Sequence, residues 1–220
     1  MARMRTAVLV SGRGSNMAAL LDAAADPAFP AEIALVLSNR PGAGALARAE
    51  AAGVPTAVVD HRAYADRSAF EAAMQAELER HAVALVCLAG FMRVLTPWFI
   101  SRWPERLVNI HPSLLPAYRG LHTHERALAD GVRIHGCTVH LVVPELDAGP
   151  IIAQAAVPVH AADTPDTLAA RVLAAEHRLY PLALSWLASG RVRHQVGRLV
   201  VDAPEAGGML LSPGSLPDQG

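Results

Sequence analysis

The sequence predicts an α/β fold with a doubly wound, mostly parallel sheet and antiparallel strands in its C-terminal half. In the first half, short apolar or β-branched runs alternate with longer alanine-rich stretches, which is typical of parallel strands covered by helices. From residue 134 onward, two strand-like runs are joined by a turn that is too short for a helical crossover, so we expect them to pair antiparallel. In open sheets of this kind, ligands bind beyond the carboxyl ends of the strands.

The first half of the chain is expected to alternate strand and helix. Strands are expected where β-branched and apolar residues cluster, at residues 6–11, 32–38, 56–59, 83–89 and 107–110. Each expected helix follows a glycine, a proline or a polar start signal. These helices lie at residues 16–25, 43–52, 67–80 and 97–102, and residues 114–133 are expected to form a loop.

The second half changes its rhythm and ends in a long helix. Thr164, Pro165 and Asp166 supply a cap, a first-turn proline and a first-turn acid, and Gly190 is a stop signal. We expect one domain over residues 1–202, with a phosphate-binding half at about 1–105 and a catalytic half at about 106–202, followed by a loose tail at 203–220. The expected elements are strands at 134–142 and 151–159, a helix at 165–188 and a strand pair within 191–201.

Composition excludes several classes of function. The net charge is -1 and the 19 basic residues, all arginine, are scattered, so no nucleic-acid partner is expected. The absence of lysine excludes a Walker-A lysine and a Schiff-base lysine. No apolar run approaches the roughly 18 residues needed to cross a bilayer, so no membrane partner is expected. Cys87 and Cys137 lie within apolar runs, as buried free thiols do, and a cytoplasmic location is expected.

A glycine loop follows the first expected strand and opens the first expected helix. Residues 11–16 read Ser-Gly-Arg-Gly-Ser-Asn, which brings free backbone N–H groups to a positive helix end and so favours a phosphate monoester. A tight structural turn explains the glycines equally well. NAD is disfavoured because Met17 replaces the third glycine of a dinucleotide loop and no acid ends the second strand. Arg40 could bind the 2'-phosphate of NADP, so an NADP site stays open as an alternative.

A second set of polar residues lies at the end of the fifth expected strand. Strand alternation places Asn109 and His111 on one side, at the carboxyl edge where chemistry is expected. Considered alone, His111 is interpreted as a histidine that makes a structural hydrogen bond, and Asp147 as a residue that stabilises a turn. His135 and His140 fall on opposite faces of one strand, so no metal site is expected, and His140 is interpreted as a buried, hydrogen-bonded residue that supports the site.

Several ordered motifs together resemble the folate-dependent phosphoribosylglycinamide formyltransferases. They run from about residue 5 to residue 193 and lie at 12–16, 88–95, 109–116, 120–124, 135–136 and 145–150. The resemblance implies a Rossmann-like formyltransferase fold, 10-formyltetrahydrofolate as cosubstrate and small-molecule substrates. Two residues depart from the family's pattern. Arg13 stands where related loops often carry a small or polar residue such as asparagine, and Arg119 stands where some relatives carry proline.

The resemblance also implies a role for each matching residue. The implied catalytic residues are Asn109, His111 and Asp147. Gly14, Ser15 and Asn16 are implied to hold the phosphate, and Glu176 the ribose. The implied folate-binding residues are Met92, Arg93, Val94, Leu95, Asn109, Val143, Leu146 and Asp147.

The implied reaction moves a formyl group from 10-formyltetrahydrofolate to the amine of 5'-phosphoribosylglycinamide. Asn109 and His111 are expected to stabilise the tetrahedral intermediate, and Asp147 to favour a charged His111 ring and pass on the proton of the amine, without a covalent enzyme intermediate.

Three alternatives stay open at this point. A formyltetrahydrofolate hydrolase would carry a regulatory domain in front, for which a strand starting at residue 6 leaves no room. A methionyl-tRNA formyltransferase would carry a further C-terminal domain and a basic surface. A non-enzymatic phosphate-ligand sensor would need neither His111 nor Asp147. The oligomeric state is open, a weak homodimer included.

Overall fold

The computed structural model describes residues 2–195, 198–203 and 212. Seven strands form one sheet in the order β3-β2-β1-β4-β5-β6-β7. The first five strands pair parallel, while β6 pairs antiparallel with both β5 and β7. The strands are β1 (Met4–Val10), β2 (Ala31–Ser38), β3 (Thr56–Val58), β4 (Leu85–Leu88), β5 (Leu107–His111), β6 (Ile134–Leu141) and β7 (Ile151–Pro158). The predicted fold class is confirmed.

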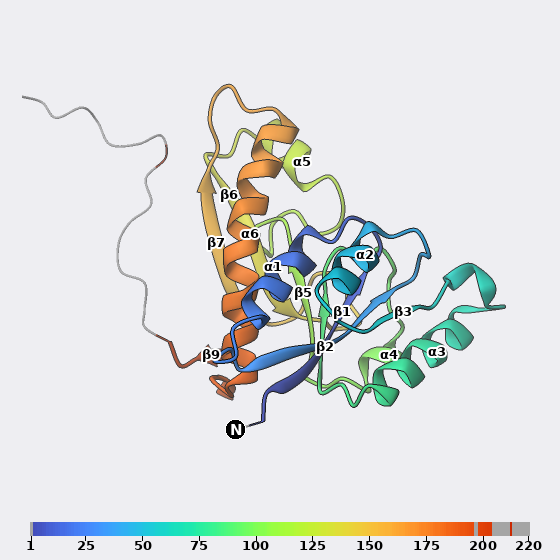
Figure 1. The fold of residues 1–220 in the computed structure, drawn as a ribbon. Helices are drawn as coiled ribbons and strands as arrows, with labels where there is room; N and C mark the ends of the chain where they lie inside the picture. The colour runs from blue at the N-terminus through green and yellow to red at the C-terminus, as the bar shows by residue number, and fades with distance from the viewer. Residues whose placement is uncertain (1, 196–197, 204–211, 213–220) are drawn as a thin grey trace, which may run out of the picture.

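Helices cover both faces of the sheet (Figure 1). The cluster on one face includes residues of α1, α2 and α6, and the cluster on the other includes residues of α3 and α4. The strands β8 (Val192–Gln195) and β9 (Arg198–Val201) form a separate antiparallel pair. The helices are α1 (Ser15–Ala24), α2 (Gly44–Ala51), the 3-10 helix η1 (His61–Ala63), α3 (Arg67–Arg80), α4 (Pro97–Ile100), α5 (Thr123–Ala129) and α6 (Pro165–Ala188).

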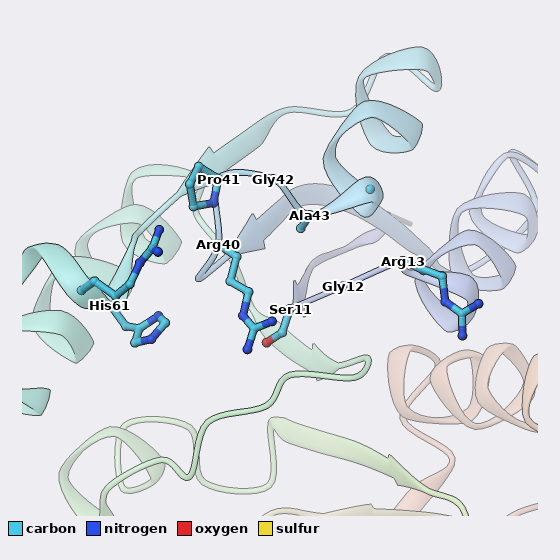
Figure 2. Close-up of a pocket in the computed structure, with 10 residues that line it drawn as sticks. Ser11, Gly12, Arg13, Arg40, Pro41, Gly42, Ala43 and His61 are labelled. Atoms are coloured by element: carbon cyan, nitrogen blue, oxygen red, sulfur yellow. The ribbon is translucent and has the colours of Figure 1, made fainter.

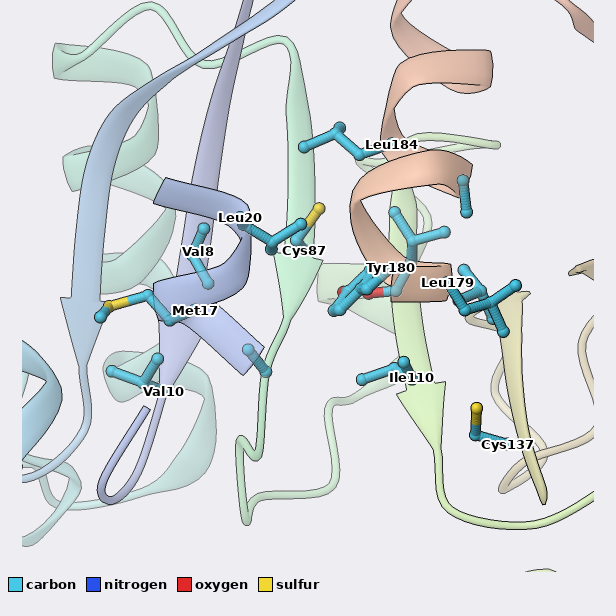
Figure 3. Close-up of a cluster of buried hydrophobic side chains, with 14 of the residues drawn as sticks. Val8, Val10, Met17, Leu20, Cys87, Ile110, Cys137, Leu179, Tyr180 and Leu184 are labelled. Carbon is cyan, nitrogen blue, oxygen red and sulfur yellow. The ribbon is translucent and has the colours of Figure 1, made fainter. Parts of the chain in front are cut away.

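Strand alternation divides the apolar residues of β1 between two cores. Val8 and Val10 belong to the core under α1 and α6, whereas Ala7 and Leu9 belong to the core under α3 and α4. Figure 3 shows Val8 and Val10 on the same side of the sheet as Leu20. The sheet is therefore buried on both faces, which explains the nearly continuous apolar run in β1.

Helix α6 fixes the centre of the first core. It begins with a capping box in which the Thr164 side chain accepts the Thr167 N–H, and Pro165 occupies the first turn, as predicted. Tyr180, which is 1% exposed and is labelled in Figure 3, donates its hydroxyl toward Leu88 O at 2.9 Å, and the hydroxyl lies 3.3 Å from Val108 O. This contact ties α6 to the last residue of β4 and to the second residue of β5.

The structure differs from the sequence-based prediction at short elements. The expected loop at 114–133 contains α5, a seven-residue helix without a side-chain cap at its first turn, so the usual start signal is missing. The three-residue η1 was not predicted, and α4 ends at Ile100 instead of residue 102. The predicted terminal strand pair is present as β8 and β9. Most of the predicted tail, residues 204–211 and 213–220, lies outside the described residues.

Within the described part of the chain, no helix is both long enough and apolar enough to cross a membrane.

Candidate active site

A hollow of about 720 Å³ lies at the carboxyl ends of β4 and β5. Asn109 and His111 both line it, as strand alternation predicts, and the turn after β6 brings Asp147 to the same wall. His140 of β6 lines it as well, opposite Asn109 in the strand register. The structure thus brings together four polar side chains that the sequence singled out.

The His111 ring has an oxygen atom beside each of its nitrogens. Nε2 lies 2.9 Å from the Tyr118 carbonyl oxygen, which can only accept, so Nε2 donates this hydrogen bond. Nδ1 lies 3.5 Å from Asp147 Oδ2. His111 is 6% exposed, so water has little access to the ring. The ring is therefore held between the Tyr118 carbonyl and the Asp147 carboxylate.

Both nitrogens of the His140 ring have hydrogen-bond partners. Its Nδ1 donates to Leu141 O at 2.9 Å, which leaves Nε2 as the acceptor for the Asn109 amide at 3.3 Å. Burial lowers the pKa of His140, although the Leu141 hydrogen bond and Asp147 act in the opposite direction. A neutral His140 therefore orients the Asn109 amide, and the second amide hydrogen remains for another acceptor. His140 is buried and hydrogen-bonded, as the sequence suggested.

Asp147 is held in place by a tight approach of its turn to β6. A Cβ added to Gly149 would lie 1.7 Å from Leu141 O, so only glycine fits at that position. Asp147 itself adopts a positive φ of 49°, which is uncommon for a residue with a side chain. Its Oδ2 accepts the Gly120 N–H at 2.9 Å, and Oδ1 lies 3.8 Å from His140 Nε2. The carboxylate therefore faces both histidines.

Side chains of β6 and β7 hold the segment after His111. The Thr138 hydroxyl donates to Ser113 O at 2.7 Å and accepts the Leu115 N–H at 3.0 Å. The Gln154 amide donates to Leu115 O at 2.9 Å. These bonds fix the segment that carries the Tyr118 carbonyl, and through it the His111 ring.

Across the mouth of the site, Arg119 pairs with Glu145 at 2.8 Å. Both side chains are solvent-exposed, so the pair is worth at most about 1 kcal/mol.

The remaining wall of the hollow is largely apolar, and several of its side chains are exposed to solvent. Met92, Val94 and Leu146, three predicted folate-binding residues, are between 56% and 63% exposed. Leu95 is buried beneath them, while Arg93 and Val143 also line the hollow. A wall of exposed apolar side chains beside fixed polar groups is the usual construction of a small-molecule site.

The residues predicted to bind the phosphate and ribose lie outside this hollow, at the start of α1, where α1 packs against α6. Gly14 has a φ of 73°, and a Cβ there would lie 2.6 Å from Ala45 Cβ, so the position requires glycine. The Asn16 amide donates to Glu176 Oε2 at 2.7 Å, and its buried Oδ1 has no partner in the part of the chain that the structure describes. Burial raises the pKa of Glu176, and the Asn16 bond partly offsets this. Ser15 is the first residue of α1.

Sequence reasoning missed the contribution of residues 121–125, which lead into α5 and form its first turn. Leu121, 71% exposed, lines the hollow together with residues 122–125. The signal was the Gly-Leu-His-Thr-His block, which carried the resemblance but received no role. Behind it, the rings of His124 and His135 lie 5.3 Å apart, and burial lowers the pKa of both, that of His135 to about 4. Among the described residues, no group of three histidines, cysteines or acids could hold a metal.

Comparison with known proteins identifies the family. The family model of the formyl transferases matches residues 4–184. The chain belongs to this family. This formyl transferase is 46% identical over 190 residues to the phosphoribosylglycinamide formyltransferase of Escherichia coli (strain K12), which covers 86% of the chain and 90% of that protein. It is 50% identical over 195 residues to the trifunctional purine biosynthetic protein adenosine-3 of Gallus gallus, covering 89% of the chain but only 19% of that longer protein.

Solved structures share the fold of this formyl transferase. Glycinamide ribonucleotide transformylase 1 from Symbiobacterium toebii has a TM-score of 0.88 at 45% identity, and the match covers 90% of this chain and 94% of that one. The formyltetrahydrofolate deformylase from Burkholderia mallei has a TM-score of 0.83 at 30% identity, covering 92% of this chain and 71% of that one. Relatives named for formyl transfer and for deformylation therefore share the fold.

Proposed function

We propose that the chain transfers the formyl group from 10-formyltetrahydrofolate to the amine of 5'-phosphoribosylglycinamide, giving the N-formyl ribonucleotide and tetrahydrofolate in de novo purine biosynthesis. One observation carries the proposal: Asn109, His111 and Asp147 converge at a hollow whose remaining wall is largely apolar. The match to the Escherichia coli phosphoribosylglycinamide formyltransferase over most of both chains supports the same reading.

The folate is proposed to occupy the hollow of about 720 Å³, which is within the usual range for a small-molecule site. Its exposed apolar side chains fit a flat ring that is largely removed from water on binding. The proposed contacts are Met92, Arg93, Val94, Leu95, Asn109, Val143, Leu146 and Asp147.

The acceptor is proposed to bind where α1 begins. Gly14, Ser15 and Asn16 present the free N–H groups of a helix start to its phosphate. The buried Asn16 Oδ1 and the Glu176 carboxylate are suited to receive ribose hydroxyls. In this arrangement residues 1–105 supply the phosphate site, and residues 106–202 supply the catalytic groups.

The proposed chemistry follows from the charges that develop during formyl transfer. The carbonyl oxygen becomes negative when the amine adds, and the Asn109 amide and the His111 ring are its donors, each typically worth about 3 kcal/mol of barrier. The amine loses a proton and the leaving nitrogen gains one. Asp147, whose side chain is 8% exposed and which faces His111, is the group that carries this proton.

No covalent enzyme intermediate is needed in this proposal. Burial raises the pKa of the thiols of Cys87 and Cys137 to about 12, so neither is a nucleophile near neutral pH. Both are free thiols, in keeping with the reducing cytoplasm in which we propose that the enzyme works.

Hydrolysis of the same folate is the second candidate, because the Burkholderia mallei deformylase shares the fold. In that reaction water replaces the amine. Incubating the purified protein with 10-formyltetrahydrofolate, with and without 5'-phosphoribosylglycinamide, separates the two. Loss of the formyl group only in the presence of the amine supports the transferase. Equal loss in both mixtures would replace it with the hydrolase, and no loss in either would leave a binding protein.

A further inference from the structure

A second hollow, of about 580 Å³, lies at the carboxyl ends of β1, β2 and β3. The loops that follow these three strands form its wall, and Figure 2 shows the lining residues. We call it the arginine hollow because Arg13, Arg40 and Arg62 line it. It is distinct from the catalytic hollow, which is built around β4 and β5, and from Ser15, Asn16 and Glu176 at the start of α1.

The wall of the arginine hollow carries an excess of positive charge. Its described lining contains three arginines and His61 but no aspartate or glutamate. Arg62 is neutralised by Asp60 at 2.8 Å. The guanidinium groups of Arg13 and Arg40 make no hydrogen bond or ion pair within the described residues. In Figure 2 the Arg40 side chain points toward Ser11, whereas Arg13 lies at the opposite end of the wall. The Arg40 guanidinium therefore lies in the hollow with its charge unpaired and its N–H donors free among the described residues.

The backbone around Arg40 leaves room for a ligand. A Cβ added to Gly12 or Gly42 would meet no atom within 4 Å. Helix α2 starts at Gly44, and its N-cap residue, Ala43, provides no side-chain hydrogen bond. The Ala45 N–H donates to Gly12 O at 3.1 Å and the Leu46 N–H to Ala43 O at 3.0 Å. Among the first-turn N–H groups, that of Gly44 makes no such bond to a described residue, and it lies at the positive end of the helix.

Ser11 separates the two hollows. Its hydroxyl donates to Asn39 Oδ1 at 2.6 Å and accepts the Met92 N–H at 2.8 Å. Because Met92 belongs to the wall of the catalytic hollow, this bonded pair lies between the two spaces. A ligand in the arginine hollow would leave the catalytic hollow free.

We propose that the arginine hollow binds the phosphate group of a phosphate ester of about nucleotide size, with the Arg40 guanidinium and the Gly44 N–H as its ligands. A guanidinium fork matches phosphate oxygens bidentately. A residue just after the second strand of a doubly wound sheet meets a ribose or its phosphate in dinucleotide folds, and Arg40 stands there. A volume of about 580 Å³ leaves space for an organic group beside the phosphate. The site lies beyond the proposed function and does not depend on it.

Calorimetric titration with adenosine 5'-monophosphate at constant ionic strength tests the proposal. The background is Ser15→Glu, in which a carboxylate repels phosphate from the start of α1. Binding persists in this background, and adding Arg40→Ala weakens it about tenfold or more because a charge-assisted pair is lost. Adding Arg48→Ala, which removes the same charge from the exposed face of α2, leaves the affinity within about twofold. Adenosine and glutarate bind weakly or not at all.

The opposite results overturn the proposal. These are no binding in the Ser15→Glu background, an equal loss with Arg48→Ala, or binding of adenosine or glutarate as tight as that of the nucleotide. If Ser15→Glu does not fold, Arg40→Ala and Arg48→Ala are compared in the otherwise unchanged chain. In that comparison, Arg40→Ala is expected to lose one of the nucleotide-binding sites seen by calorimetry, and Arg48→Ala is expected to keep it. Retention of every binding event in Arg40→Ala also ends the proposal.

Discussion

Asp147 Oδ2 lies 3.5 Å from His111 Nδ1, although one residue stands in the turn between β6 and β7 and the other ends β5. The antiparallel pairing of β5 with β6 places His140 opposite Asn109, and the turn after β6 folds back so that Asp147 Oδ1 lies 3.8 Å from His140 Nε2. Gly149 permits the close approach of that turn to Leu141. The pair gives the site an acid and a ring with which to exchange a proton.

Asp147→Asn is expected to lower kcat by about 100-fold to 10,000-fold, because the amide cannot take up the proton. The amide oxygen still accepts the Gly120 N–H, so the fold is expected to remain intact. Steady-state kinetics with both substrates, together with thermal unfolding, check this. Glu145→Gln is the matched control, since Glu145 is an exposed carboxylate on the same turn and should retain near-normal turnover. Near-normal turnover in Asp147→Asn would remove the carboxylate from the mechanism.

His111→Ala and Asn109→Ala are each expected to lower kcat by about 100-fold or more, since each removes one donor to the developing negative oxygen. Affinity for both substrates should change little, because these donors act mainly in the transition state. Kinetics with the two substrates varied in turn separate kcat from KM. His160→Ala, at an exposed position outside the hollow, serves as the control. A rise in KM with an unchanged kcat would assign binding, and not catalysis, to these side chains.

Ser15→Glu is expected to raise the KM for 5'-phosphoribosylglycinamide and to leave the KM for the folate unchanged. A carboxylate at the first position of α1 repels the phosphate that we place there. Ser68→Glu is the matched control, because Ser68 is exposed in the first turn of α3, remote from both hollows. If both variants keep the wild-type KM for the acceptor, the phosphate binds elsewhere.

Acidification is expected to destabilise the fold through His135. Burial lowers the pKa of His135 to about 4, below the value of about 6.5 expected in the unfolded chain. The neutral ring is therefore favoured by folding, so its contribution is complete above about pH 6.5 and is lost as pH falls toward 4. The loss amounts to about 3 kcal/mol on this basis.

Denaturant unfolding of the wild type and His135→Phe at pH 7 and pH 5 measures this contribution. The ring of Phe cannot titrate, so the variant should lose less unfolding free energy than the wild type between these values. An equal loss in both proteins would show that another group is responsible. His160→Phe, at an exposed position, controls for the exchange of histidine by phenylalanine.

Tyr180→Phe is expected to lower the free energy of unfolding by about 1–3 kcal/mol, because it leaves the buried carbonyls of Leu88 and Val108 without their hydroxyl partner. Tyr64→Phe, which removes a hydroxyl from a partly exposed tyrosine, should have little effect. Equal stability of all three proteins would mean that the Tyr180 hydroxyl makes no net contribution.

Much of the fold follows from local patterns. The alternation of apolar runs with alanine-rich segments predicted the parallel strands and their covering helices, because burial on both faces imposes that pattern. The start of α6 was predicted because a cap and a first-turn proline act locally. Helix α5 was not, since its cap residue, His122, adopts a positive φ and its side chain does not cap the helix backbone.

The sequence by itself determined the fold class and the placement of Asn109 and His111 on one side of a strand, since strand alternation is a local property. Their roles came from resemblance to a family. Only the tertiary structure decided which partner each ring nitrogen faces, that His140 orients Asn109, and that three strand ends enclose an arginine hollow. These contacts join residues that are far apart in the chain. Local sequence patterns do not determine such distances, because they depend on how the whole chain packs.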